Sequence, residues 1–125
     1  MTKAGGFYYE RSLELIRSLE PVIVDGDCIS ACTLILRVAP WQICATHRAR
    51  FVFHAPWSYA DDGTMVSTTK ARDFLMTLYP SNVRRWIESK GGLTEKYIFL
   101  KGAEMYQYVQ PCPSPVQLIK LQGLY

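Results

Sequence analysis

The stretch from Val22 to Pro56 constrains the fold of this chain most strongly, because its pattern indicates a strand, a helix and a second strand in close succession. Val22–Val24 is a β-branched run between turn-forming residues, which is typical of a short strand buried on both faces. Residues 31–38 are mostly apolar and predict a helix, and Arg50–His54 predicts a further strand. This order of elements favours an α/β domain.

Two polar side chains stand at the ends of these expected strands. Ser30 precedes the helix, where it would be an N-cap or first-turn residue with its hydroxyl close to free backbone N–H groups. His54 ends the second strand. Active sites of open α/β sheets gather at the carboxyl ends of strands, so Ser30 and His54 are candidates for a nucleophile and its general base. An imidazole, with an unperturbed pKa of ~6.5, can accept the proton of a serine hydroxyl near neutral pH.

The residues around both positions are similar to those of a known group of proteins. The pattern consists of C-x-S-A-C-T at 28–33, Ile-Cys at 43–44 and Phe-His-Ala at 53–55. It resembles the ClpP/crotonase-like superfamily, and more closely the poorly characterised bacterial proteins, many of them periplasmic, that carry this C-x-S-A-C-T signature. The resemblance covers Gly5 to about Val109. It implies an α/β domain with short, mostly parallel strands flanked by helices.

The resemblance also implies an activity. A serine hydrolase of the peptidase type would act on peptide or ester bonds through Ser30 and His54, without a cofactor. The oxyanion would be bound by backbone N–H groups, one from the Gly5/Gly6 turn and one from Ala31. Proteins of this superfamily commonly assemble as trimers or larger rings, so a homo-oligomer is expected as well.

The third member of the triad departs from the family pattern. Residues 99–104 are similar to the segment that holds this member in the Clp protease proteolytic subunit, but Tyr97 stands where that subunit has an aspartate. Asp61 and Asp62 are the other candidates, because they lie in the polar loop at 57–68. That loop follows the histidine directly and is expected to act as a lid or substrate-binding arm. Loss of the orienting aspartate can lower turnover by ~10⁴-fold.

A second hypothesis belongs to a different functional class. A serine at a helix start is often only a cap, and a histidine at a strand end is often satisfied by a neighbour. The chain would then be a catalytically silent binding or assembly module that keeps the fold for its surface. A short Ser30–His54 separation, near ~3 Å between the reacting side-chain atoms, distinguishes the hydrolase from the module.

The first residues bear on localisation. The chain starts four residues before Gly5, so the usual first strand and helix of the family fold are missing, and an N-terminally trimmed domain is expected. Residues 1–6 lack the apolar stretch of a signal peptide. Localisation therefore stays open, with a periplasmic protein implied by the resemblance alone.

Length and charge limit the class of protein. The chain has 125 residues and is 49% hydrophobic, so residues 1–125 are expected to form one domain, with an irregular tail from about residue 110. A net charge of +3 arises from 14 basic and 11 acidic residues dispersed along the chain, which argues against nucleic-acid binding. No apolar run approaches the ~18 residues that a membrane-spanning helix needs.

Four cysteines leave several arrangements open. Cys28, Cys32, Cys44 and Cys112 fit two disulfides, with three connectivities, or one disulfide and two free thiols. Cys28 and Cys32 have a C-x3-C spacing compatible with zinc, but the other two stand alone, and no metal site is predicted. The spacing also differs from the C-x-x-C of redox pairs. Structural cysteines, buried or bridged, are favoured.

Three further helices are predicted. Apolar residues at helical spacing predict amphipathic core helices within Phe7–Glu20 and Thr69–Tyr79, the second stopped by a proline. The first includes Leu19 among its apolar positions, and the second includes Phe74. A shorter helix is expected at Asn82–Lys90, closed by a glycine pair.

The remaining segments carry weaker signals. Tyr97–Leu100 predicts a short strand, and residues 103–109 a helical turn. The three tryptophans, Trp41, Trp57 and Trp86, are interpreted as core residues rather than as the lining of a pocket.

Overall fold

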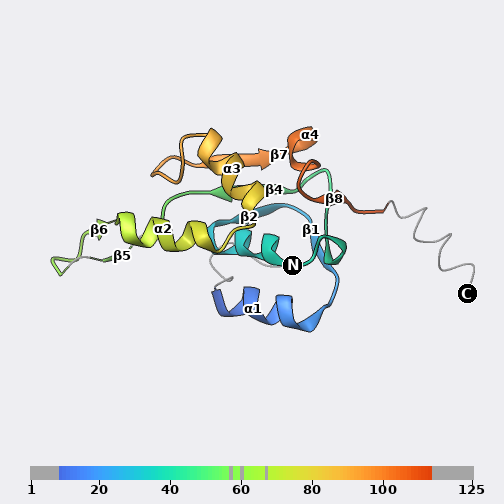
Figure 1. Ribbon diagram of the computed structural model, residues 1–125, viewed down its shortest axis with the longest axis horizontal. Helices are drawn as coiled ribbons and strands as arrows, with labels where there is room; N and C mark the ends of the chain where they lie inside the picture. The colour runs from blue at the N-terminus through green and yellow to red at the C-terminus, as the bar shows by residue number, and fades with distance from the viewer. Residues whose placement is uncertain (1–8, 57, 60, 67, 114–125) are drawn as a thin grey trace, which may run out of the picture.

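The computed structural model describes residues 9–56, 58–59, 61–66 and 68–113 (Figure 1). Its helices are α1 (Tyr9–Ser18), the 3-10 helices η1 (Ser30–Arg37) and η2 (Pro40–Gln42), α2 (Thr69–Thr77), α3 (Ser81–Ser89) and α4 (Gly102–Met105). Its strands are β1 (Val22–Val24), β2 (Asp27–Ile29), β3 (Ile43–Ala45), β4 (Arg50–Phe53), β5 (Ser58–Tyr59), β6 (Met65–Val66), β7 (Ile98–Lys101) and β8 (Gln110–Pro111). The mixed α/β class predicted from the sequence is confirmed.

The strands form two small three-stranded sheets and a hairpin. One sheet has the order β1-β3-β8, the other β2-β4-β7, and β5 pairs with β6. The pairs β1–β3, β3–β8 and β2–β4 are parallel, whereas β4–β7 and β5–β6 are antiparallel. The chain therefore visits the two sheets alternately from β1 to β4.

The chain switches sheets at Gly26. Strand β1 has its predicted bounds, but Ile23 is 55% exposed between the buried Val22 and Val24, so the prediction of burial on both faces is wrong. Strand β2 follows after only two residues and belongs to the other sheet. Gly26 has φ +122°, which a residue without a Cβ adopts readily. Its carbonyl oxygen accepts a hydrogen bond of 3.0 Å from the Arg50 N–H, at the start of β4. The break between β1 and β2 thus brings β2 beside β4.

Strand β4 lies at the centre of its sheet and is buried on both faces. Phe51, Val52 and Phe53 are each at most 1% exposed. The Phe53 ring packs against Tyr79 and Trp86, with ring centroids 5.5 and 5.4 Å apart. Burial of such a side chain is worth about 1.5–3 kcal/mol, so β4 anchors the core directly before His54.

The first predicted helix is confirmed as α1, with one correction. Leu15 is buried, and α1 packs against η1. Leu19, predicted as a core position, is exposed because the helix ends at Ser18 and Leu19 takes a left-handed φ of 60°. Gln42 Nε2 donates a 2.6 Å hydrogen bond to the Leu15 carbonyl oxygen and ties α1 to η2.

The prediction that α2 is a core helix holds only in part, because Leu75 and Met76 are partly buried against the core while Phe74, on the predicted apolar face, is not. No residue of α2 is fully buried, and Phe74 is 61% exposed. Helical spacing reveals an apolar stripe but does not reveal whether another element covers it. In Figure 1, α2 and the β5–β6 hairpin extend together from one end of the molecule.

Helix α3 agrees with its prediction, from Ser81 to Ser89. The glycine pair that closes it, Gly91 and Gly92, has φ values of +100° and +82°. Val83, Trp86 and Ile87 form the buried face. The other elements predicted at the C-terminal side are also present, as β7 and the short helix α4.

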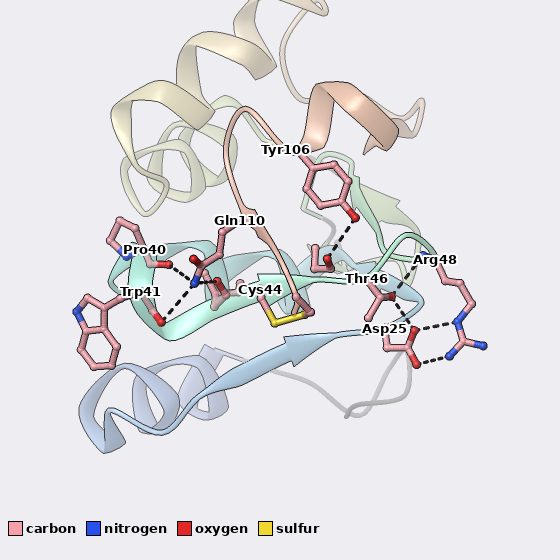
Figure 2. The surroundings of a disulfide bond; sticks show 11 residues. Asp25, Pro40, Trp41, Cys44, Thr46, Arg48, Tyr106 and Gln110 are labelled. Carbon is pink, nitrogen blue, oxygen red and sulfur yellow. Dashed lines mark hydrogen bonds and ion pairs between the residues drawn. A yellow bond between two sulfur atoms is a disulfide. The ribbon is translucent and has the colours of Figure 1, made fainter. Parts of the chain in front are cut away.

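The tail is ordered further than expected. Gln110–Pro111, where irregular structure was predicted, forms β8 and pairs with β3. A disulfide then joins Cys112 to Cys44, a residue of β3 (Figure 2). Gln110 Nε2 also donates a 3.1 Å hydrogen bond to the Ile43 carbonyl oxygen. The sequence signal failed because a two-residue strand depends on its partner and on a covalent link.

The tryptophans divide between core and surface. Trp86 is buried, as predicted. Trp41 is 62% exposed, so the core interpretation is wrong for this residue, which lies in the short helix η2 at the surface. Trp57 lies outside the described residues.

Candidate active site

Ser30 stands at a sharp junction between a strand and a helix. Strand β2 ends at Ile29 and η1 begins at Ser30, whose φ is +58°. For an L-residue this left-handed conformation costs about 1–2 kcal/mol relative to the right-handed one. The exposed side chain of Ser30 therefore sits on a strained turn.

Helix capping does not explain the strain. The N-cap residue of η1 is Ile29, which makes no side-chain cap hydrogen bond, so the prediction that Ser30 is the N-cap is wrong and its first-turn position is confirmed. Among the contacts described, only the carbonyl oxygen of Ser30, and not its hydroxyl, takes part in a side-chain hydrogen bond. The hydroxyl is left available for another role.

His54 lies at the same edge of the sheet as Ser30. Strands β2 and β4 are parallel, with Cys28 opposite Phe51 and Ile29 opposite Val52. Ser30 follows β2 and His54 follows β4, so both leave the carboxyl ends of adjacent strands, which run about 4.8 Å apart. No hydrogen bond joins the two side chains among the described residues. Catalytic hydrogen bonds of this kind often form only with substrate bound.

The ring of His54 is held by the backbone. Its Nδ1 lies 2.8 Å from the carbonyl oxygen of Ala55. A carbonyl oxygen only accepts, so this hydrogen bond requires a proton on Nδ1. In the neutral ring Nε2 then carries the lone pair, which is the protonation state that a general base needs.

Of the three candidates for the third member, Tyr97 is the one that contacts His54. Strands β4 and β7 are antiparallel with Phe53 opposite Ile98, which brings Tyr97 beside His54. The two rings stack with centroids 4.9 Å apart and planes 25° apart. The contact is through the ring face, so Tyr97 limits the orientation of the imidazole without supplying a carboxylate.

The two aspartates lie in the turn of the β5–β6 hairpin. The Asp62 carboxylate accepts hydrogen bonds from the Thr64 N–H at 3.0 Å and the Thr64 hydroxyl at 2.7 Å. These bonds lower the pKa of Asp62 below its ordinary value. No contact joins Asp61 or Asp62 to His54 among the described residues. The segment predicted as a polar loop forms a hairpin, with its Asp-Gly turn at Gly63, where φ is +86°.

A disulfide encloses the serine. Cys28 and Cys32, four residues apart, are bonded to each other, and both are buried. Together with the Cys44–Cys112 bond this gives two disulfides, one of the arrangements that the sequence left open. The C-x3-C pair therefore presents no thiolates to a metal ion. The spacing of these cysteines around Ser30 is the sequence signal for this covalently closed turn.

The expected oxyanion donors can be placed only in part. The Ala31 N–H belongs to the first turn of η1, where N–H groups have no partners within the helix. Gly5 and Gly6 lie outside the described residues.

A comparison of the chain with family models, curated proteins and solved structures finds no match in any of the three. Its function is therefore inferred from the geometry around Ser30 and His54. Within the described part of the chain, no helix has the length and apolar character needed to cross a membrane.

Proposed function

We propose that this protein is a serine hydrolase of the peptidase type, acting on peptide or ester bonds, with Ser30 as the nucleophile and His54 as the general base. The observation that carries this proposal is the left-handed φ of Ser30 at the β2–η1 junction, in a residue whose hydroxyl does no capping. Strained backbone of this kind clusters at functional sites, and a nucleophilic serine on a strained strand-to-helix turn is a recurring arrangement in hydrolases.

The reaction follows from the roles of these groups. Ser30 Oγ attacks the substrate carbonyl carbon while His54 Nε2 takes the hydroxyl proton, and the carbonyl π electrons move to the oxygen. The Ala31 N–H faces the resulting oxyanion. The intermediate collapses, the bond to the leaving group breaks, and His54 returns its proton to that group. Water then cleaves the acyl ester by the same steps and restores both side chains.

The backbone takes the place of the usual acid. The Ala55 carbonyl oxygen orients the His54 ring as a carboxylate would, but it carries no full charge to stabilise the imidazolium. We therefore expect slower turnover than in a complete triad, by up to ~10⁴-fold. Acylation by a reactive probe should be less affected than turnover of an amide.

Two disulfides fit an oxidising compartment. They support the periplasmic location that the C-x-S-A-C-T resemblance implies. Assembly into a homo-oligomer also remains a proposal from that resemblance.

The second candidate function is a catalytically silent binding or assembly module. It is favoured by an apolar hollow of about 490 Å³, lined by Ile23, Trp41 and the Cys44–Cys112 disulfide among other residues, but not by Ser30 or His54. Exposed tryptophan beside an apolar hollow is typical of a contact surface. If this function holds, Trp41→Ser should weaken self-association in sedimentation experiments while the chain stays inert to serine-directed probes.

Labelling with a fluorophosphonate separates the two functions. An activated serine forms an Oγ–P bond, the P–F bond breaks, and fluoride and the serine proton are released. Native protein should label, whereas Ser30→Ala and His54→Ala should not. Ser81→Ala and His47→Ala, which change exposed residues of the same types, should label at the native rate. Folded native protein that does not label, or a Ser30→Ala variant that still does, would contradict the hydrolase proposal.

A further inference from the structure

A buried chain of hydroxyl groups ends on the backbone of Ser30. Thr33 Oγ1 donates a 2.5 Å hydrogen bond to the Ser30 carbonyl oxygen. The Tyr79 hydroxyl lies 2.5 Å from the same Thr33 Oγ1, although it is 46 residues away in the chain. Thr33 is fully buried and Tyr79 nearly so.

The direction of these bonds follows from proton counting. A threonine hydroxyl has one proton, and Thr33 gives it to the Ser30 carbonyl oxygen. Tyr79 must therefore donate to Thr33. Burial raises the pKa of Tyr79 to about 12, against a smaller lowering by its bond to Thr33. The phenol consequently stays protonated, and stays a donor, throughout the physiological range.

The link to Tyr79 distinguishes this arrangement from an ordinary helix contact. Threonine hydroxyls often bond to a carbonyl oxygen one turn back in a helix, without any further role. Here the hydroxyl is also fixed by Tyr79, whose ring packs on Phe53 of β4, next to His54. The orientation of the Ser30 carbonyl is thus coupled to the strand that carries the base.

We infer that Tyr79 and Thr33 are positioning residues that aim the Ala31 N–H at the reacting oxygen, an inference that rests on the proposed role of Ser30. The Ser30 carbonyl and the Ala31 N–H belong to one planar trans peptide unit and point in opposite directions. Holding the carbonyl oxygen toward Thr33 therefore turns the N–H away from Thr33 and Tyr79. The direction of the oxyanion donor is then set by two hydroxyls that never touch the substrate.

The test measures the second-order rate constant of fluorophosphonate labelling in three variants of the network and one control variant. Deleting an oxyanion donor costs about 10²–10³-fold in rate, so misdirecting one in Thr33→Val should cost at least ~10-fold. Thr33→Ser keeps the hydroxyl and should stay within about threefold of the native rate. In Tyr79→Phe the Thr33 hydroxyl is no longer held by Tyr79 and can donate to another acceptor. Its labelling rate should lie between the rates of Thr33→Val and Thr33→Ser. Val109→Ala, which truncates a buried residue outside the network, controls for lost stability.

The Thr33→Ser variant distinguishes a positioning role of the Thr33 hydroxyl from a packing role of the side chain. A merely structural role predicts that Thr33→Ser, which loses a buried methyl group, labels no better than Thr33→Val. If Thr33→Val does not fold, Tyr79→Phe carries the test alone. Native labelling rates in both Thr33→Val and Tyr79→Phe, or equal losses in Thr33→Val and Thr33→Ser, would overturn the inference while the hydrolase proposal stands. Native protein that does not label would instead overturn the hydrolase proposal, and the positioning role with it.

Discussion

Ser30 combines an unfavourable backbone conformation with an available hydroxyl, and these two properties make opposite demands on the residue type. Glycine would suit φ +58° better, because it adopts the left-handed region without a Cβ penalty. Glycine, however, has no side-chain nucleophile, whereas the serine hydroxyl can take the role proposed for this position. A serine that serves catalysis at this position therefore lowers the stability of the folded protein.

The first prediction compares two inactive variants of this residue. Ser30→Ala keeps the strained left-handed backbone conformation, and Ser30→Gly relieves the strain. The free energy of unfolding should therefore be about 1 kcal/mol higher for the glycine variant than for the alanine variant. Urea denaturation with both disulfides intact measures the difference. An alanine variant that is as stable as the glycine variant would mean that φ +58° is not a strained state of Ser30.

Residue patterns predicted part of this site. The rule that sites gather at the carboxyl ends of strands suggested Ser30 and His54 as candidates. Ser30 was expected after the Val22–Val24 strand, but it follows β2, which was not predicted and which lies parallel to β4, the strand before His54. The stacking of Tyr97 on His54 could not be predicted, because it depends on the antiparallel pairing of β7 with β4. The bond of Thr33 to Tyr79 joins distant parts of the chain and leaves no local pattern.

Among the secondary-structure elements, the two disulfides are expected to have different structural roles. The Cys44–Cys112 bond joins β3 to the end of β8 across 68 residues, whereas the Cys28–Cys32 bond closes a loop of only four. The stabilisation from restricting the unfolded chain grows with loop length. The long link should therefore matter for stability, and the short one for the shape of the β2–η1 turn.

Paired alanine variants test this division. On the chain-entropy estimate, Cys44→Ala with Cys112→Ala should lower the free energy of unfolding by about 4 kcal/mol, and Cys28→Ala with Cys32→Ala by about 2 kcal/mol. Fluorophosphonate labelling should respond in the reverse order, with the larger loss of rate in the second pair. Equal labelling rates in the two pairs would show that the short disulfide does not shape the turn around Ser30.

Elements with strong local signals were predicted well, and elements that depend on partners were not. Strands β1 and β4 have β-branched or aromatic runs, and α3 has a clear stop at its glycine pair. Strands β2 and β8 are short and contain no run of β-branched or aromatic residues. Helix α2 has the right spacing but little of the molecule covers it, because burial is decided by tertiary packing.

In the molecule as a whole, two ion pairs, Arg48–Asp25 and Arg50–Asp27, lie where the chain passes between its two sheets. Asp25 accepts from Arg48 and from the Thr46 hydroxyl, which Figure 2 shows, and Asp27 makes a two-point contact with Arg50 at 2.7 Å. All four charged side chains are partly exposed, so solvent screens the pairs and their contribution at neutral pH is small. Their effect is seen best as a dependence on pH.

The pH profile of the unfolding free energy should fall at both ends. Hydrogen bonds from Arg48 and Arg50 lower the pKa values of Asp25 and Asp27, so their contribution is complete above the ordinary value of 3.8 and is lost as pH falls through the lower folded values. Tyr79 has its pKa raised from 10.0 to about 12, so its contribution is complete below pH 10.0 and is lost as pH rises toward about 12.

Two variants test whether the aspartates cause the loss of stability at acid pH and Tyr79 the loss at alkaline pH. Asp27→Asn should reduce the loss on the acid side and leave the part due to Asp25, and Tyr79→Phe should flatten the alkaline side without changing the acid side. Chemical denaturation at a series of pH values provides the measurement. Alkaline loss of stability that persists unchanged in Tyr79→Phe would assign it to another group.

Activation of Ser30 underlies the proposed chemistry, and locating the fluorophosphonate adduct on the native protein shows whether this residue reacts. Peptide mapping by mass spectrometry should find one phosphonyl group per chain, on the peptide that contains Ser30, with both disulfides intact. A folded, disulfide-bonded protein that takes up no label, or that takes it up on another residue while Ser30 stays unmodified, would mean that Ser30 is not an activated nucleophile.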